Sequence, residues 1–162
     1  MSNMEELEQA IEITTGDQFV TFKLEDEEYG IEILKVHEII GYQGFAKVPN
    51  VPCFIKGVLN LRGSVVPVID MRLKFNMAEK AYDNYTVIVI LEVQERIIGA
   101  IVDAVSDVVA LSPKEIQDTP DFSSGVRVDF IKGLGRKDEK LIIMLDIDRI
   151  LGEQEFDLHD AA

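Results

Sequence analysis

The apolar positions along the chain follow the pattern of β-strands. Residues 19–24 and 87–93 are rich in β-branched and aromatic residues, the types that pleated sheets favour. Each run is followed by a short charged stretch and then by a second apolar run that contains an isolated glycine, Gly30 or Gly99. The pattern predicts two β-hairpins, and the glycine within each return strand predicts a bulge or sharp bend there.

The same order of apolar residues occurs twice in the chain. When Gly30 is placed on Gly99, the apolar positions on both sides match without a gap, and Gly57 placed on Gly133 brings two runs beginning FIKG into register. An internal repeat of this kind predicts two copies of one module of roughly 65–70 residues. The two registers match Val36 with Val105, Glu38 with Asp107, Ile39 with Val108, Arg62 with Asp138, Val65 with Leu141 and Asp70 with Asp146.

Each module contains a second hairpin. In the first copy, residues 54–61 and 65–70 form two apolar runs joined by a turn from Asn60 to Ser64. Asp70 and its counterpart Asp146 each lie between a strand and a short mixed segment, where a carboxylate can cap the first turn of a helix. We therefore expect a short helix after each second hairpin.

Together these elements predict a mainly β protein with short terminal helical segments. Two tandem barrels of about five strands, packed together, bury the apolar runs and remove exposed sheet edges. The first barrel is expected at about 17–80 and the second at about 81–152, with strand exchange between them left open. Residues 31–40 also fit one face of a helix. Residues 1–16 and 153–162 are predicted to be acidic tails.

Charge and composition narrow the classes of function. The chain has 30 acidic and 16 basic residues, a net charge of −14, and much of the excess lies at its two ends. This field repels phosphate and argues against nucleic acid and anionic membrane surfaces. A single cysteine, no signal peptide and no apolar run of about 20 residues indicate a cytoplasmic protein without direct membrane insertion.

The sequence offers little to support catalysis. It has two histidines, no Cys–His spacing typical of zinc, and no phosphate-binding loop. Residues 146–148 (DID) could suggest a metal, but the match of Asp146 with Asp70 favours a helix cap. We expect no cofactor and no enzymatic activity. Two alternatives remain open: a small nucleic-acid-binding β-barrel module, and an enzyme whose site is assembled between the modules.

The two copies differ most in the loop of the second hairpin. The first copy reads VLNLRGSV after Gly57, and the second reads LGRKDEKL after Gly133. The second loop is a solvated run of charges, whereas the first is apolar with one arginine, Arg62. Because a guanidinium suits both ion pairing and partner recognition, Arg62 must either pair with an acid or face a partner.

Three stretches carry a resemblance to a known family. The run GVLNLRGSVVPVIDMRLKF, the upstream EEYGIEILKVHEI and the later IVDAVSDVV resemble the CheW family of bacterial chemotaxis coupling proteins, over about residues 17–152. The resemblance implies two SH3-like five-stranded barrels, no catalysis, and a stand-alone adaptor. It implies two partners: the cytoplasmic hairpin tip of chemoreceptors and the regulatory domain of the histidine kinase CheA, which has the same two-barrel fold.

The resemblance also points to residues involved in coupling. Arg62 and Glu38 are expected to pair or lie close together, and an exposed pair contributes only about 0–1 kcal/mol, a weak reason to hold an arginine in an apolar loop. Val36 is equally compatible with a core position, and for Gly57, Gly99 and Gly133 a role in keeping strands bent is favoured over a role in binding. The positions implied for partner binding are Val36, Glu38, Gly57, Arg62, Gly99 and Gly133.

Overall fold

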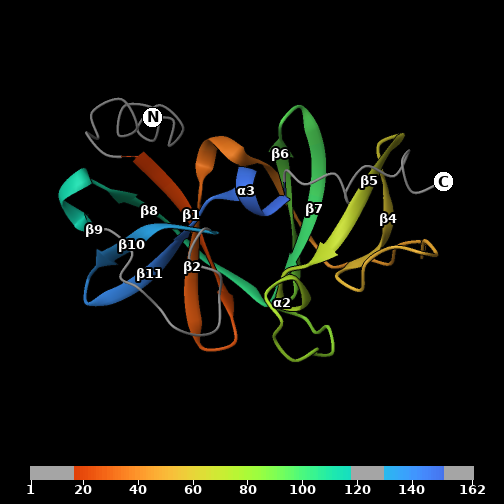
Figure 1. The fold of residues 1–162 in the computed structure, drawn as a ribbon, viewed down its shortest axis with the longest axis horizontal. Coiled ribbons are helices and arrows are strands. Elements are labelled where there is room, and N and C mark those ends of the chain that lie inside the picture. Colours follow the sequence, from red (N-terminus) through yellow and green to blue (C-terminus); the bar gives the residue numbers. More distant parts are fainter. Residues whose placement is uncertain (1–16, 118–129, 152–162) are drawn as a thin grey trace, which may run out of the picture.

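A computed structural model describes residues 17–117 and 130–151. The described residues are mainly strand, in two groups that lie side by side (Figure 1). The predicted N-terminal helical turn and the acidic tails, 1–16 and 153–162, lie outside the described residues.

The first part of the described chain contains seven strands, one 3₁₀ turn and one short helix. These are β1 (Asp17–Leu24), β2 (Glu27–Glu32), η1 (Ile33–Lys35), β3 (Val36–Gly41), β4 (Ile55–Leu61), β5 (Ser64–Asp70), α2 (Met71–Lys74), β6 (Val87–Val93) and β7 (Arg96–Val102). The remainder contains β8 (Ala104–Leu111), η2 (Pro113–Glu115), β9 (Ile116–Gln117), β10 (Ile131–Lys137), β11 (Lys140–Leu145) and α3 (Ile147–Leu151).

The strands form two sheets that exchange strands between the repeats. The six-stranded sheet has the order β8-β1-β2-β11-β10-β9, and the five-stranded sheet has the order β3-β6-β7-β5-β4. Each sheet therefore combines the first hairpin of one copy with the later strands of the other. Neither sheet coincides with residues 17–80 or 81–152, because the chain crosses between sheets at η1 and again after β7.

The exchange joins the copies through two parallel ladders, β2 with β11 and β7 with β5. Gly30 pairs with Met144 in the first ladder and Gly99 pairs with Val68 in the second. Of the bulge or sharp bend predicted at these glycines, the bulge is wrong, since the antiparallel register runs through both without a shift. The shifts fall elsewhere: between Thr21 and Phe22, Val36 and Glu38, Ile55 and Gly57, and Ile131 and Gly133.

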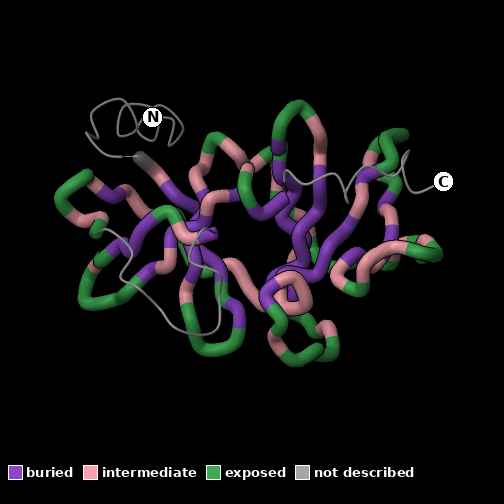
Figure 2. Tube along the Cα trace, in the orientation of Figure 1, coloured by how far each residue is buried: buried purple, intermediate pink, exposed green. Residues whose placement is uncertain are grey.

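The largest apolar cluster contains residues of both sheets and lies between them. Figure 2 shows the buried segments gathered toward the middle of the molecule and the exposed ones at the hairpin tips. β6 is apolar at all positions except Glu92 because its two faces contribute to different clusters. Val89 and Leu91 belong to the shared cluster, whereas Ile88 and Ile90 fill the five-stranded barrel. Smaller clusters therefore fill each barrel, and the shared core holds the two together.

The turns and caps follow their sequence signals. Arg62 and Gly63 form the two-residue turn between β4 and β5, both with positive φ, and the Gly63 N–H donates to Asn60 Oδ1 over 2.9 Å. Asp70 Oδ1 accepts from the Arg72 N–H over 2.9 Å at the start of α2. Asp146 accepts from the Arg149 N–H over 3.2 Å in α3, so both predicted caps are present.

Candidate partner-binding site

The first candidate residues lie on β3, an edge strand of the five-stranded sheet. β3 is hydrogen-bonded to β6 on one side, and its other edge carries no ladder within the described residues. Val36 is half-buried: part of its side chain packs against the shared core, and the rest is accessible to a partner. The register shift between Val36 and Glu38 leaves His37 unmatched with β6.

Arg62 and Glu38 pair as the sequence suggested. Arg62 Nη2 donates to Glu38 Oε1 over 2.9 Å, so the pair connects the β4–β5 turn to the opposite edge strand of the same sheet. The Arg62 side chain remains 65% exposed and that of Glu38 28% exposed. A guanidinium with this exposure keeps donors available to a partner while the glutamate fixes its direction.

The equivalent place in the six-stranded barrel has different chemistry. The counterparts of Glu38 and Arg62 are Asp107 and Asp138, two acids. Asp138 occupies the same turn position as Arg62, with φ 50° in both cases, so the backbone is preserved while the charge is reversed. Two carboxylates cannot form an ion pair, and the Arg62–Glu38 arrangement is therefore specific to the five-stranded barrel.

The three candidate glycines are all buried. A Cβ added at Gly57 would lie 2.0 Å from the Ala46 carbonyl oxygen, and one at Gly133 would lie 2.9 Å from that of Gln117. A Cβ at Gly99 would meet Ile88 Cγ2 at 3.0 Å inside the five-stranded barrel. Each glycine therefore makes room for a neighbouring group, which is a backbone carbonyl at Gly57 and Gly133 and the Ile88 side chain at Gly99.

Sequence reasoning missed an apolar groove at the far end of the five-stranded barrel. It consists of two adjoining pockets that share Phe45. One is lined by Tyr42, Val51 and Tyr82 together with Lys47 and Lys56, and the other by Val58 and Val65. The described residues that line it include no acid, and Lys47 makes no ion pair with any described residue. Val65 is 68% exposed, and its repeat counterpart Leu141 is exposed as well.

The aromatic residues of the groove form a connected cluster. The Tyr42 and Tyr82 rings lie 4.6 Å apart, and the Phe45 ring meets Tyr42 edge-on at 6.1 Å. The Tyr82 hydroxyl donates to Asp70 Oδ2 over 2.9 Å. Burial, reinforced by the Asp70 carboxylate, raises the pKa of Tyr82 far above its ordinary value, so the phenol stays protonated and structural.

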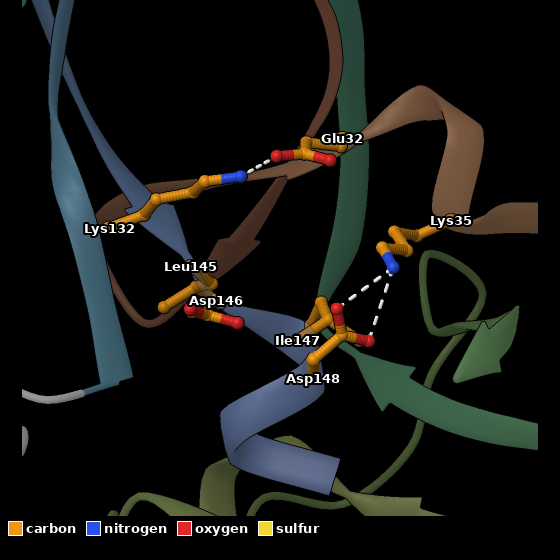
Figure 3. Close-up of a pocket in the computed structure, with 7 residues that line it drawn as sticks. All are labelled: Glu32, Lys35, Lys132, Leu145, Asp146, Ile147 and Asp148. Atoms are coloured by element: carbon orange, nitrogen blue, oxygen red, sulfur yellow. Dashed lines mark hydrogen bonds and ion pairs between the residues drawn. The ribbon is translucent and has the colours of Figure 1, made fainter. Parts of the chain in front are cut away.

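A second, smaller pocket is charged and lies where the chain crosses between sheets. Figure 3 shows Lys35 pointing at both carboxylate oxygens of Asp148, and Lys132 pointing at Glu32. Asp146 also lines this pocket, and its Oδ2 lies 3.5 Å from Arg149 Nε. Each acid of this pocket therefore has a cation beside it, and no cluster suited to a metal ion occurs among the described residues.

With this geometry in view, comparison with known proteins identifies the family. The sequence model of one protein family, the CheW-like domain, matches residues 18–155 of this chain. The chain belongs to the CheW family. The chemotaxis protein CheW of Klebsiella aerogenes is 44% identical over 147 residues, which cover 91% of this chain and 89% of that protein. CheW of Bacillus subtilis is 33% identical over 146 residues, which cover 88% and 92%.

A solved structure agrees with the family assignment. The crystal structure of the scaffolding protein TtCheW from Thermoanaerobacter tengcongensis matches with a TM-score of 0.77 and 32% identity, covering 83% of this chain and 87% of that one. The chain is accordingly a chemotaxis coupling or scaffold protein of mainly β fold and not an enzyme. Among the described residues, no helix has the length and apolar character needed to cross a membrane.

Proposed function

We propose that this CheW family member is a cytoplasmic adaptor that joins the cytoplasmic tips of chemoreceptors to the regulatory domain of the histidine kinase CheA. The observation that carries the proposal is the exposed Arg62–Glu38 pair beside Val36, on the edge of one barrel only. A surface that serves the fold alone would be expected in both copies of a repeat, whereas this one is replaced by two acids in the other copy.

An adaptor needs two surfaces, and the five-stranded barrel offers two, which approach each other near the turn that holds Arg62. We assign the β3 surface, formed by Val36, Glu38 and Arg62, to the receptor tip. We assign the apolar groove, with Val65 exposed at its rim, to the kinase regulatory domain. A second barrel of similar fold can present a complementary apolar end, and burying exposed aliphatic and aromatic groups is the main source of affinity in such contacts.

Replacing Arg62 with glutamate should weaken receptor binding while leaving the fold intact. The substitution puts a like charge beside Glu38 and removes a cation from the surface, so we expect the Kd for a purified receptor cytoplasmic fragment to rise about tenfold or more. The free energy of unfolding should change by only about 0.5 kcal/mol, since the residue is an exposed turn position. Titration calorimetry and chemical denaturation measure the two quantities.

Asp138→Lys is the matched control for this experiment. It changes the charge at the same turn position of the other barrel, with the same backbone conformation. We expect receptor binding and stability close to those of the unmodified chain. Normal receptor binding by Arg62→Glu would show that the β3 surface is not the receptor site, and unfolding would show that the arginine is structural.

A further inference from the structure

The crossover that leads into β3 is held by one ion pair outside the proposed binding surface. η1 carries the chain from β2 in the six-stranded sheet to β3 in the five-stranded sheet. Lys35, its last residue, donates from Nζ to Asp148 Oδ2 over 2.9 Å and to Oδ1 over 3.2 Å. Asp148 belongs to α3, whose apolar residues are buried in the shared core, so the lysine fixes the start of β3 to a rigid element.

β3 depends on such anchors because it is supported on one edge only. Its ladder with β6 is interrupted between Val36 and Glu38, at the residues of the proposed receptor surface. The strand is therefore tied by Lys35 to Asp148 just before Val36, and by Glu38 to Arg62 just after it. A shift at either tie would change the direction in which Val36 and Glu38 face a partner.

The other crossover carries a corresponding pair with the charges reversed. The offset that matches Asp70 with Asp146 also matches Arg72 with Asp148. Arg72 in α2 pairs with Asp103, which connects β7 to β8, with Nη2 2.6 Å from Oδ2 and Nε 2.8 Å from Oδ1. Both copies thus tie the short helix to a crossover by an ion pair. The helix residues of the two pairs are repeat counterparts, whereas Lys35 and Asp103 are not, since the offset of 69 places Lys35 on Ala104. The two copies therefore reach a similar tie with different crossover residues, which favours a role in fixing the crossover.

The two ties differ in burial. The Arg72 and Asp103 side chains are 11% and 12% exposed, whereas those of Lys35 and Asp148 are 32% and 42% exposed.

We propose that Lys35 and Asp148 are positioning residues for the receptor surface: they set the placement of β3 without touching the partner. This inference rests on the proposed function. In the same pocket Lys132 pairs with Glu32, so neither of these two side chains competes with the Lys35–Asp148 pair (Figure 3).

The test uses the full chain and a purified receptor cytoplasmic fragment. Lys35→Ala should weaken receptor binding by roughly fivefold, the upper range for a partly exposed pair, with kinase-domain binding unchanged. Hydrogen exchange of the β3 amides, residues 36–40, should become faster. The reversed pair, Lys35→Asp with Asp148→Lys, should recover most of the affinity, whereas either reversal alone should not. A role in stability alone would not predict recovery together with an effect on one partner only.

Lys137→Ala is the control, because the Lys137–Glu115 pair is similarly exposed but lies in the other barrel. It should leave receptor binding unchanged. Normal receptor binding by Lys35→Ala, or no recovery in the reversed pair, would overturn the positioning role. Arg62→Glu measured in the same series separates the two claims: if it also binds normally, the receptor surface itself is misplaced, and if it alone is impaired, only the positioning inference fails.

Discussion

Replacing Arg72 with methionine should lower the free energy of unfolding by about 3 kcal/mol, because it leaves a nearly buried carboxylate without its partner. Arg72 makes two hydrogen bonds to Asp103 and a third to the Ala78 carbonyl oxygen, 3.0 Å away. Asp103 also accepts from the Glu25 N–H over 2.9 Å, in the β1–β2 turn. Loss of the Arg72–Asp103 pair should therefore destabilise the contact between the two barrels. Urea denaturation measures it.

The double variant Arg72→Met with Asp103→Leu is the control for this prediction. Removing both charges eliminates the unpaired carboxylate, so the double variant should be more stable than Arg72→Met alone. If Arg72→Met unfolds at the same urea concentration as the unmodified chain, the pair contributes nothing to holding the barrels together. The ion pairs at the crossovers would then be incidental contacts.

The Arg72–Asp103 pair also makes the free energy of unfolding depend on pH in the acidic range. Burial by itself would raise the pKa of Asp103, but the hydrogen bonds from Arg72 and from the Glu25 N–H outweigh it and lower the pKa below the ordinary value of 3.8. The stabilisation is therefore fully present above the unfolded-state pKa and is lost as pH falls through the folded-state pKa. The stability difference between the unmodified chain and Arg72→Met should shrink over that interval in denaturation curves measured at successive pH values.

Gly57→Ala should be the most damaging of the glycine substitutions. Its Cβ would lie 2.0 Å from the Ala46 carbonyl oxygen and 2.8 Å from the carbonyl carbon, and a backbone group cannot move aside cheaply. Relief requires breaking the bridge in which Ala46 and Val58 exchange hydrogen bonds of 2.8 and 2.7 Å. We expect a loss of about 3 kcal/mol or more, measured by thermal and urea unfolding.

Gly133→Ala provides a graded comparison from the other copy. Its Cβ would meet the Gln117 carbonyl oxygen at 2.9 Å and Ile116 Cγ2 at 3.0 Å, so the cost should be about 1–2 kcal/mol. A Gly57→Ala protein that kept full stability yet lost partner binding would reverse our interpretation. Gly57 would then be a contact residue, as the family resemblance implies, and not a spacer.

Much of the local structure could be predicted from the sequence, since hairpins, turns and caps depend on neighbouring residues. The strand at 87–93 has the predicted bounds, and Asp70 and Asp146 cap short helices as expected. The exchange of strands between copies could not be predicted. Two copies with matching apolar faces can pair within or between themselves, and only the packing of the whole chain decides between these arrangements.

The candidate site was predicted in part. Arg62 stood out because a charged residue in an apolar turn needs a partner, and its repeat counterpart Asp138 showed that the fold does not require it. The groove was missed because Val65 and Tyr82 come from segments that lie far from Tyr42 and Phe45 in the sequence. Lys35 and Asp148 were missed for the same reason, being 113 residues apart. Contacts between distant segments follow from the tertiary fold and not from local pattern.

The most direct test of the adaptor proposal is a bridging measurement with three components. An immobilised receptor cytoplasmic fragment is incubated with the CheA regulatory domain, with and without this chain, and the retained kinase domain is quantified. The proposal predicts that the kinase domain is retained only when the unmodified chain is present, and that Arg62→Glu retains far less while Asp138→Lys retains a normal amount. Equal retention with and without the chain, or full retention by Arg62→Glu, would contradict it.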